Sequence, residues 1–314
     1  MNSATETIVG ANELTKRFAE IAAVNGLSFS VQRGEIFGLV GPDGAGKTTT
    51  MRMLAGVLPP DSGSIVIDGI DVVADPEEGK QHISYMPQRF GLYEDLTVDE
   101  NIRFYADLFE VAPRVREERA DRLLAASSMS QFRTRLAGQL SGGMKQKLGL
   151  TCALVHTPKI LLLDEPTTGV DPVSRRDFWR ILYNLRNEGV TILISTAYLD
   201  EAERCNRLAL LHNGKVLYCD TPPALKQRMP GALIVVSSAD GREVRAAIAD
   251  LAGVSNVILV GDGVHAVVDD ANLRIPELRE ALQRANVPFA DIAVGEPSIE
   301  DVFVALLESG GDTL

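Results

Sequence analysis

A glycine-rich stretch followed by lysine and threonine carries the clearest chemistry in this sequence. Gly41, Gly44 and Gly46 let the backbone bend so that successive N–H groups point at phosphate oxygens, and a helix that begins near Lys47 adds the positive end of its dipole. In this pattern the lysine lies on the β- and γ-phosphates of a nucleotide, and the Thr48 hydroxyl lies on Mg²⁺. The predicted phosphate cradle consists of Gly41, Pro42, Asp43, Gly44, Ala45, Gly46, Lys47, Thr48 and Thr49.

Two adjacent carboxylates further along the chain suit the same chemistry. Four apolar residues precede Asp164, which predicts a strand with this carboxylate at its C-terminal end, where it can hold the Mg²⁺ shell. Glu165 is then placed to orient or deprotonate an attacking water. Either residue alone could be an acid in a surface loop, but the combination with Lys47 favours a nucleotide site.

Strands and helices must hold these groups in place. Residues 35–40 predict a short buried strand that leads into the glycine-rich stretch, and residues 48–54 predict a helix that follows it. Apolar residues recur at helical spacing over 98–109 and 115–127, with charges on the other face. This arrangement favours an α/β fold.

The segment Ser141-Gly-Gly-Met-Lys-Gln146 resembles the signature of the ABC ATPases, and residues 8 to about 220 follow the motif order of that family. The resemblance implies a P-loop NTPase domain with a RecA-like core and a helical subdomain at about 90–155. It also implies that Phe18 stacks on adenine and that Gln88 reaches Mg²⁺ and senses the transporter. The catalytic residues would then be Lys47, Gln88 and Glu165, and the magnesium ligands Thr48, Gln88 and Asp164.

The same resemblance implies a site shared between two ATPase domains. Ser141 and Gly143 would contact the γ-phosphate held by the opposite subunit, with Gly142 between them, and Asp171 belongs to the segment that matches the D-loop. The expected ligands are ATP and Mg²⁺, and the expected partner is a second ABC ATPase domain, identical or different.

Three further segments are similar to the first ATPase half of YbhF-type proteins, which serve drug and ion exporters of the ABC-2 class. They are residues 41–46, 90–97 and 198–203. The similarity implies an ATP-hydrolysing subunit that powers an exporter through ATP-driven dimerisation, together with integral membrane permease subunits. Phe90 and Tyr93 are the expected permease contacts. The alternatives are a weakly hydrolysing regulatory half of a heterodimer and a non-transport ABC protein.

Two positions depart from the family pattern. Most members carry a histidine after the Ser-Thr pair, where this chain has Ala197, whose side chain cannot hydrogen-bond a γ-phosphate. Asp43 stands where the family has asparagine or serine, and a pair of identical chains would bring it toward Asp171 of the partner. These differences favour a partner half that has its own histidine.

Composition limits the partners and the location. A net charge of −12 argues against nucleic acid, because phosphate contacts need a basic face. No run of about 18 apolar residues and no basic-then-apolar leader is present, so we expect a cytoplasmic protein, peripheral on the inner face of the cell membrane. Three cysteines without metal-like spacing are expected to be reduced thiols.

Proline and glycine signals at 222–231 predict a domain boundary. We therefore expect a nucleotide-binding domain over 1–230 and an accessory domain over 231–314. The latter shows the pattern of a ferredoxin-like α+β fold, βαββαβ, over 232–238, 241–251, 255–260, 264–268, 275–285 and 291–294. It holds no catalytic constellation, which favours a docking or dimer-supporting module over an effector-binding one.

Overall fold

The computed structural model describes residues 6–89, 91–261 and 263–308. The chain divides into two compact units, Met1–Cys219 and Asp220–Leu314. The division falls before the boundary expected near Gly231, because helix α8 (Pro222–Lys226) contacts the last helix of the second unit, α11 (Ile299–Glu308).

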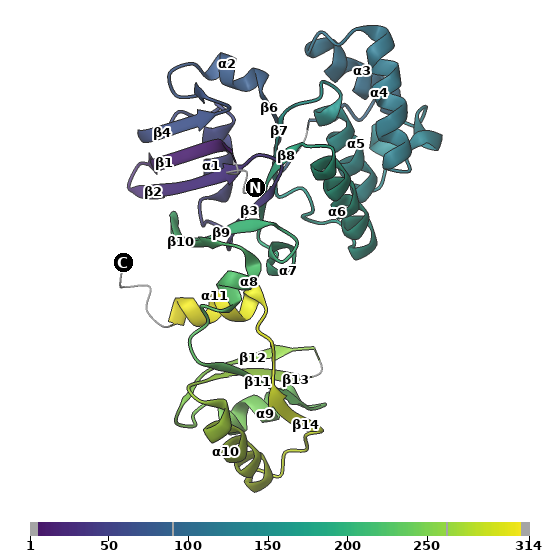
Figure 1. Ribbon diagram of the computed structural model, residues 1–314. Coiled ribbons are helices and arrows are strands. Elements are labelled where there is room, and N and C mark those ends of the chain that lie inside the picture. The colour runs from purple at the N-terminus through teal and green to yellow at the C-terminus, as the bar shows by residue number, and fades with distance from the viewer. Residues whose placement is uncertain (1–5, 90, 262, 309–314) are drawn as a thin grey trace, which may run out of the picture. The chain divides into compact units, whose positions relative to one another are not determined.

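The first unit is built around a six-stranded sheet with the strand order β10-β9-β3-β8-β7-β6 (Figure 1). Its strands are β3 (Ile36–Val40), β6 (Ile83–Met86), β7 (Ile160–Asp164), β8 (Thr191–Thr196), β9 (Arg207–His212) and β10 (Lys215–Asp220). Strands β9, β3, β8, β7 and β6 are parallel to their neighbours in this order. Every residue of β3, β7 and β8 is buried, as expected for parallel strands covered on both faces.

A second, four-stranded sheet of the first unit is antiparallel, with the order β2-β1-β4-β5. Its strands are β1 (Thr7–Phe18), β2 (Ile21–Gln32), β4 (Ser62–Ile67) and β5 (Ile70–Asp71). Helix α1 (Lys47–Leu54) contacts β2 of this sheet as well as β7 and β8. Apolar side chains of both sheets and of α1 form one core. The strand and helix predicted on either side of the glycine-rich stretch are thus confirmed as β3 and α1.

The remaining helices of the first unit are α2 (Pro76–Gln81), α3 (Val98–Leu108), α4 (Pro113–Ala126), α5 (Gly142–Leu154), α6 (Pro172–Asn187) and α7 (Leu199–Ala202), with 3-10 turns at Ser130–Phe132 and Ala137–Gln139. Helices α3, α4 and α5 share a core of their own. A Thr97–Glu100 capping box starts α3, as its sequence favours. The two helices predicted over 98–109 and 115–127 are confirmed as α3 and α4.

The second unit contains β11 (Ala232–Ser237), α9 (Gly241–Ile248), β12 (Val254–Val260), β13 (Gly263–Val268), α10 (Ala271–Arg284) and β14 (Asp291–Val294). The predicted βαββαβ order is present, and the sheet is antiparallel with the order β12-β13-β11-β14. Residues of α9 and α10 pack on Ile234 and Val236, whereas α11 packs through Ala305 on Leu233 and Val267. Neighbouring residues of a strand point to opposite faces, so α11 covers the other face of this sheet.

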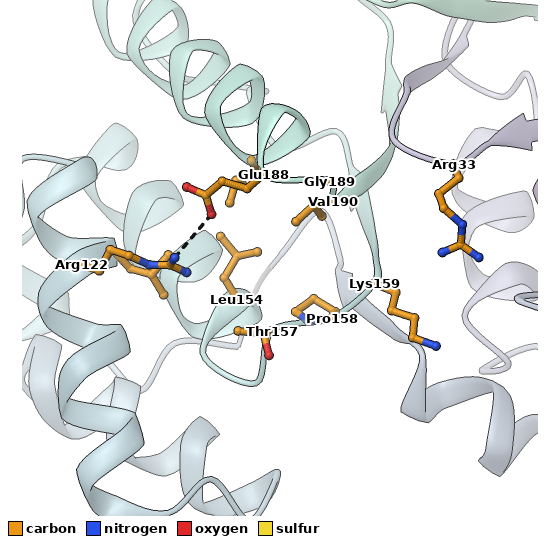
Figure 2. A pocket seen from close by; sticks show the side chains of 11 residues that line it. Arg33, Arg122, Leu154, Thr157, Pro158, Lys159, Glu188, Gly189 and Val190 are labelled. Atoms are coloured by element: carbon orange, nitrogen blue, oxygen red, sulfur yellow. Dashed lines mark ion pairs between the residues drawn. The ribbon is translucent and has the colours of Figure 1, made fainter. Parts of the chain in front are cut away.

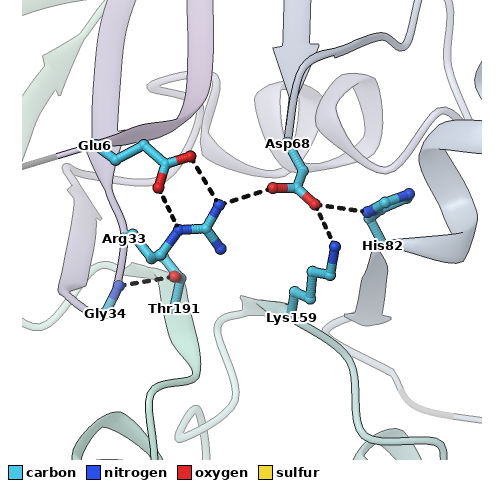
Figure 3. A network of polar contacts seen from close by, with 7 residues as sticks. All are labelled: Glu6, Arg33, Gly34, Asp68, His82, Lys159 and Thr191. Carbon is cyan, nitrogen blue, oxygen red and sulfur yellow. Dashed lines mark hydrogen bonds and ion pairs between the residues drawn. The ribbon is translucent and has the colours of Figure 1, made fainter.

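A network centred on Asp68 ties together five segments of the first unit (Figure 3). Asp68 lies in the turn between β4 and β5. Its Oδ1 accepts a hydrogen bond from Arg33 at 2.9 Å; its Oδ2 accepts one from Lys159 at 2.6 Å and lies 2.9 Å from Nδ1 of His82. Arg33 in turn forms a two-bond pair with Glu6. Hydrogen bonds from Lys159 and Arg33 hold the pKa of Asp68 well below its usual range.

Replacing Asp68 with asparagine is expected to reduce the free energy of unfolding by about 1–2 kcal/mol at pH 7, because charge-assisted hydrogen bonds are lost. The folded-state pKa of Asp68 lies below its unfolded value of about 3.9, so its contribution is present above pH 4 and is lost as the pH falls further. Urea unfolding at pH 7 and pH 3 should therefore show a difference between parent and Asp68→Asn that shrinks at pH 3. Glu77→Gln, which breaks the exposed pair with Lys80, is the control and should have little effect.

Candidate active site

The glycine-rich loop joins the end of β3 to the start of α1, and two of its glycines have conformations that other residues rarely adopt. Gly44 has φ +80° and Gly46, at the N-cap of α1, has φ +99°. A Cβ atom on Gly46 would lie 2.5 Å from the carbonyl oxygen of Ala23, and one on Gly41 would lie 2.3 Å from that of Leu211. The loop therefore depends on glycine at these positions.

Lys47 is buried, with 4% of its surface exposed, and its ammonium group has three acceptors. Nζ donates to the carbonyl oxygens of Gly41 at 2.8 Å and Pro42 at 3.0 Å. It also lies 3.0 Å from Oε1 of Glu165. The predicted phosphate-binding lysine and the predicted catalytic carboxylate thus form an ion pair.

Asp164 lies at the end of β7 and accepts hydrogen bonds from three hydroxyl groups. Thr48 and Ser195 donate to Oδ1 at 3.0 Å and 2.7 Å, and Tyr85 donates to Oδ2 at 3.2 Å. Burial, together with the charge of Asp164, raises the pKa of Tyr85 far above its ordinary value, so this phenol stays a donor. Strands β3, β8 and β7 are neighbours, and their carboxyl ends bring Asp164 to the first turn of α1.

Glu165 has φ +48°, an unusual backbone conformation for a residue other than glycine. Such strain costs about 1–3 kcal/mol and is often found at functional sites. Its N–H donates to Oγ of Ser195 at 3.0 Å, which holds the backbone in place. Its side chain accepts from Nε2 of Gln88 at 3.0 Å, in addition to the contact with Lys47. The structure therefore brings together Lys47, Gln88 and Glu165.

These residues line a cavity of about 620 Å³. Its lining comprises Ile21, Ala22, Ala23, Asp43, Gly44, Gly46, Lys47, Thr48, Thr49, Gln88, Glu165 and Asn213. A different cavity of about 300 Å³, shown in Figure 2, contains the Arg122–Glu188 ion pair and none of the predicted site residues. The larger cavity is therefore the candidate active site.

Nine predicted residues do not line this cavity: Gly41, Pro42 and Ala45 of the loop, Asp164 at the end of β7, and the five described next. Phe18 is 49% exposed and pairs with Ile21 across the turn between β1 and β2. Ser141 caps α5 and Asp171 caps α6, where hydrogen bonds from Ser174 lower the pKa of Asp171. Gly142 and Gly143 lie beside the start of α6, since a Cβ on Gly143 would lie 2.6 Å from the side chain of Ser174. The segments 141–146 and 169–174 therefore lie next to each other.

Sequence reasoning missed several residues of the site. Ser195 donates to the carboxylate of Asp164 and accepts from the N–H of Glu165, and Tyr85 donates to Asp164. Ile21, Ala22 and Ala23 form a small apolar wall of the cavity. The sequence does show a hydroxyl, Ser195, near the end of an apolar run, and a tyrosine, Tyr85, three residues before Gln88. Neither can be assigned to Asp164 until the order of the strands in the sheet is known.

The donor set near Thr48 suits magnesium. Thr48 and Asp164 present oxygen atoms 3.0 Å apart, and hard cations such as Mg²⁺ prefer oxygen. Among the described residues, no three His, Cys, Asp or Glu side chains are grouped as a metal site. Magnesium sites for phosphate chemistry often use only one or two protein carboxylates, so the residues present fit this ion.

Within the described ranges, no helix is both long enough and apolar enough to cross a membrane.

A glycine-rich loop, a buried lysine and two carboxylates at the carboxyl edge of a parallel sheet define a P-loop nucleotide-binding protein. The family model described as ABC transporter matches residues 24–168. The chain is 45% identical over 313 residues to the probable multidrug ABC transporter ATP-binding protein YbhF of Escherichia coli (strain K12), covering 98% of this chain and 53% of that protein. It is 34% identical to the daunorubicin resistance ATP-binding protein DrrA2 of Streptomyces coeruleorubidus, covering 95% and 94% of the two chains.

A solved structure described as the ATP binding subunit of an ABC transporter has a TM-score of 0.64 at 30% identity, covering 71% of this chain and 93% of that one. The dimeric ATP-binding cassette MJ0796 bound to ADP and Pi has a TM-score of 0.62 at 26% identity, covering 68% and 98%. The chain belongs to the ATP-binding proteins of ABC transporters. It spans about half the length of YbhF, 53%.

Proposed function

We propose that this chain hydrolyses ATP and thereby powers a membrane exporter of the ABC-2 class. The contact of Lys47 and Gln88 with Glu165 in one cavity, beside the hydrogen bond from Thr48 to Asp164, carries the catalytic part of the proposal. The export part is supported by relatives whose names include multidrug ABC transporter, daunorubicin resistance and Nod factor export. Drug or ion efflux is the proposed transport, driven by ATP-dependent dimerisation.

The residues of the cavity have distinct proposed roles. The loop N–H groups and Lys47 bind the phosphates, so a phosphate competes with Glu165 for the lysine. Glu165, released from Lys47, orients the attacking water and accepts its proton, while Gln88 holds the carboxylate. Thr48, Asp164 and Gln88 would hold Mg²⁺, which would supply positive charge that offsets the charge of the phosphates.

A second ATPase domain is the proposed partner, because Ser141, Gly143 and Asp171 lie outside this chain's own cavity. Asp171 stays ionised, since hydrogen bonds from Ser174 lower its pKa. Two carboxylates about 5 Å apart repel by roughly 3 kcal/mol at an effective dielectric of about 20. A self-pair that brings Asp43 to the partner's Asp171 would carry this cost twice. We therefore favour a heterodimer with a different ATPase half that has its own histidine at the position of Ala197.

An apolar groove between α3, α5 and β6 is the proposed docking site for a cytosolic helix of a permease. Its cavity measures about 250 Å³ and is lined by Ala55, Val57, Lys80, Ile83, Ser84, Tyr85, Tyr105, Leu108, Phe109, Cys152 and Ala153. Val57 and Leu108 are 62% and 63% exposed, unusual values for apolar side chains in the wall of a groove. Tyr85, which also bonds Asp164, connects this groove to the active site. Of the two expected permease contacts, Tyr93 is 43% exposed, and Phe90 lies outside the described residues.

Leu108→Glu is expected to reduce association with the permease at least tenfold, because a charge would be buried against an apolar helix. The measurement is co-purification with co-expressed membrane subunits of an ABC-2 exporter, alongside ATP affinity by calorimetry. ATP affinity should not change, since Leu108 does not line the nucleotide cavity. Leu273→Glu, at another exposed leucine, is the matched control. Equal co-purification of Leu108→Glu and the parent would contradict the docking site.

The regulatory alternative also has an observation in its favour. Ala197 follows Thr196 at the end of β8, where the family pattern has histidine, and an alanine methyl group cannot hydrogen-bond a phosphate. A weakly hydrolysing half of a heterodimer would show this feature. A parent chain without measurable turnover, alone and with its partner half, would favour this alternative.

A further inference from the structure

A buried carboxylate outside the nucleotide cavity joins three segments, two of which contact residues of the active site. Glu201, on α7, is 0% exposed. Its Oε2 accepts hydrogen bonds from Thr167 at 3.0 Å and Thr196 at 2.9 Å, and its Oε1 accepts one from Nε1 of Trp179 at 3.0 Å. A buried carboxylate is costly unless it is bonded, so these three contacts are expected to be rigid.

Two partners of Glu201 belong to segments with a second tie to the site, and the third lies on a neighbouring helix. Thr167 precedes Thr168, whose hydroxyl donates to Oε2 of Glu165 at 3.4 Å. The carbonyl oxygen of Thr196 accepts a hydrogen bond from the N–H of Gly41 at 3.3 Å. Trp179 lies on α6, the helix that Asp171 caps. Glu201 therefore connects the loop after Glu165, the end of β8 and the D-loop helix.

Arg175 on α6 provides a nearby positive charge. Its Nε lies 3.9 Å from Oε1 of Glu201, and its guanidinium lies 3.4 Å from Asp200 and 4.9 Å from the centre of the Tyr198 ring. The N–H of Tyr198 donates to the hydroxyl of Thr196 at 3.0 Å. The segment around Ala197 is thus held from both sides by groups that contact Glu201.

We propose that Glu201 is a positioning residue for ATP hydrolysis, and the proposal rests on the proposed catalytic role of Glu165. Through Thr167 and Thr196 it holds the loop that carries Glu165 against the end of β8, which contacts the phosphate-binding loop. Because Ala197 cannot bond a phosphate, the position of this segment depends on contacts within the chain. Loss of the network should slow turnover more than it weakens ATP binding, since no member of it lines the nucleotide cavity.

The experiment compares Thr167→Val with Thr167→Ser in the full chain, because valine keeps the shape and removes the hydroxyl whereas serine keeps the hydroxyl. We expect Thr167→Val to lower kcat about tenfold or more, because small displacements of reacting groups slow catalysis on this scale. The dissociation constant of Mg-ATP should stay within about twofold of the parent value. Thr167→Ser should restore most of the turnover. Thr151→Val is the control, since Thr151 is also buried and, among the residues that the structure describes, its hydroxyl bonds only the Lys147 carbonyl oxygen of its own helix.

Trp179 is the single tryptophan of the chain, so its fluorescence reports on the bond to Glu201. Glu201→Gln keeps the shape and removes the charge beside the indole. We expect a shifted emission maximum in this variant and a lowered kcat, with circular dichroism at the parent value. An unshifted emission maximum, or an unchanged kcat in both Thr167→Val and Glu201→Gln, would overturn the proposal.

Glu165→Gln, measured in parallel, separates this inference from the proposed function. If Glu165→Gln loses turnover while Thr167→Val retains it, the positioning role of Glu201 fails and the catalytic assignment stands. If Glu165→Gln keeps the turnover of the parent, the catalytic assignment fails, and the positioning role fails with it.

Discussion

Replacing Lys47 with alanine is expected to abolish measurable Mg-ATP binding. The ammonium group of Lys47 is buried beside the glycine-rich loop. The carbonyl oxygens of Gly41 and Pro42 accept its hydrogen bonds and fix its position. Charge-assisted hydrogen bonds to phosphate contribute about 1.5–3 kcal/mol each, and two of them correspond to roughly a hundredfold or more in affinity. Isothermal calorimetry on parent and variant measures this loss directly.

The Lys47–Glu165 pair complicates the interpretation of the single variant. Alanine at position 47 leaves the buried carboxylate of Glu165 without its cation, which destabilises the fold as well as the site. The double variant Lys47→Ala, Glu165→Gln removes both charges. We expect it to unfold at nearly the temperature of the parent and still to bind no ATP. Binding at the affinity of the parent in either variant would contradict the assignment of Lys47.

Replacing Glu165 with glutamine is expected to stop ATP hydrolysis while ATP binding persists. Glutamine retains the shape and can still contact Gln88, but it cannot accept the proton of the attacking water. General-base catalysis is typically worth about 10²–10⁴-fold, and phosphate release assays should show a loss of this size in kcat. ATP affinity should equal or exceed that of the parent, because Lys47 no longer has a carboxylate that competes with the phosphate.

The same variant should prolong an ATP-bound dimer with the partner half, which sedimentation with ATP and Mg²⁺ can detect. Glu188→Gln is a suitable control, because Glu188 is an exposed acid paired with Arg122, outside the cavity. Hydrolysis at the parent rate in Glu165→Gln would show that another group activates the water. In that case the strained backbone of Glu165 would need a different explanation.

Local sequence pattern determined the elements and the chemistry of the phosphate-binding loop. The glycines, Lys47 and Thr48 are adjacent in the chain, so their spacing alone predicts a loop that β3 and α1 then provide. Asp164 follows an apolar run and lies at the end of β7 as predicted. The βαββαβ order of the second unit was predictable for the same reason, because each helix and strand shows its own periodicity.

Contacts between distant segments were decided only by the tertiary structure. Ser195 is 31 residues from Asp164, and Thr48 is 116 residues from it, so no local pattern links them. Their meeting depends on the strand order β3-β8-β7, which brings three carboxyl ends together. The Lys47–Glu165 pair and the burial of Glu201 arise in the same way. The hydrogen bonds of a buried polar group depend on which segments pack around it, and that packing is a property of the whole unit.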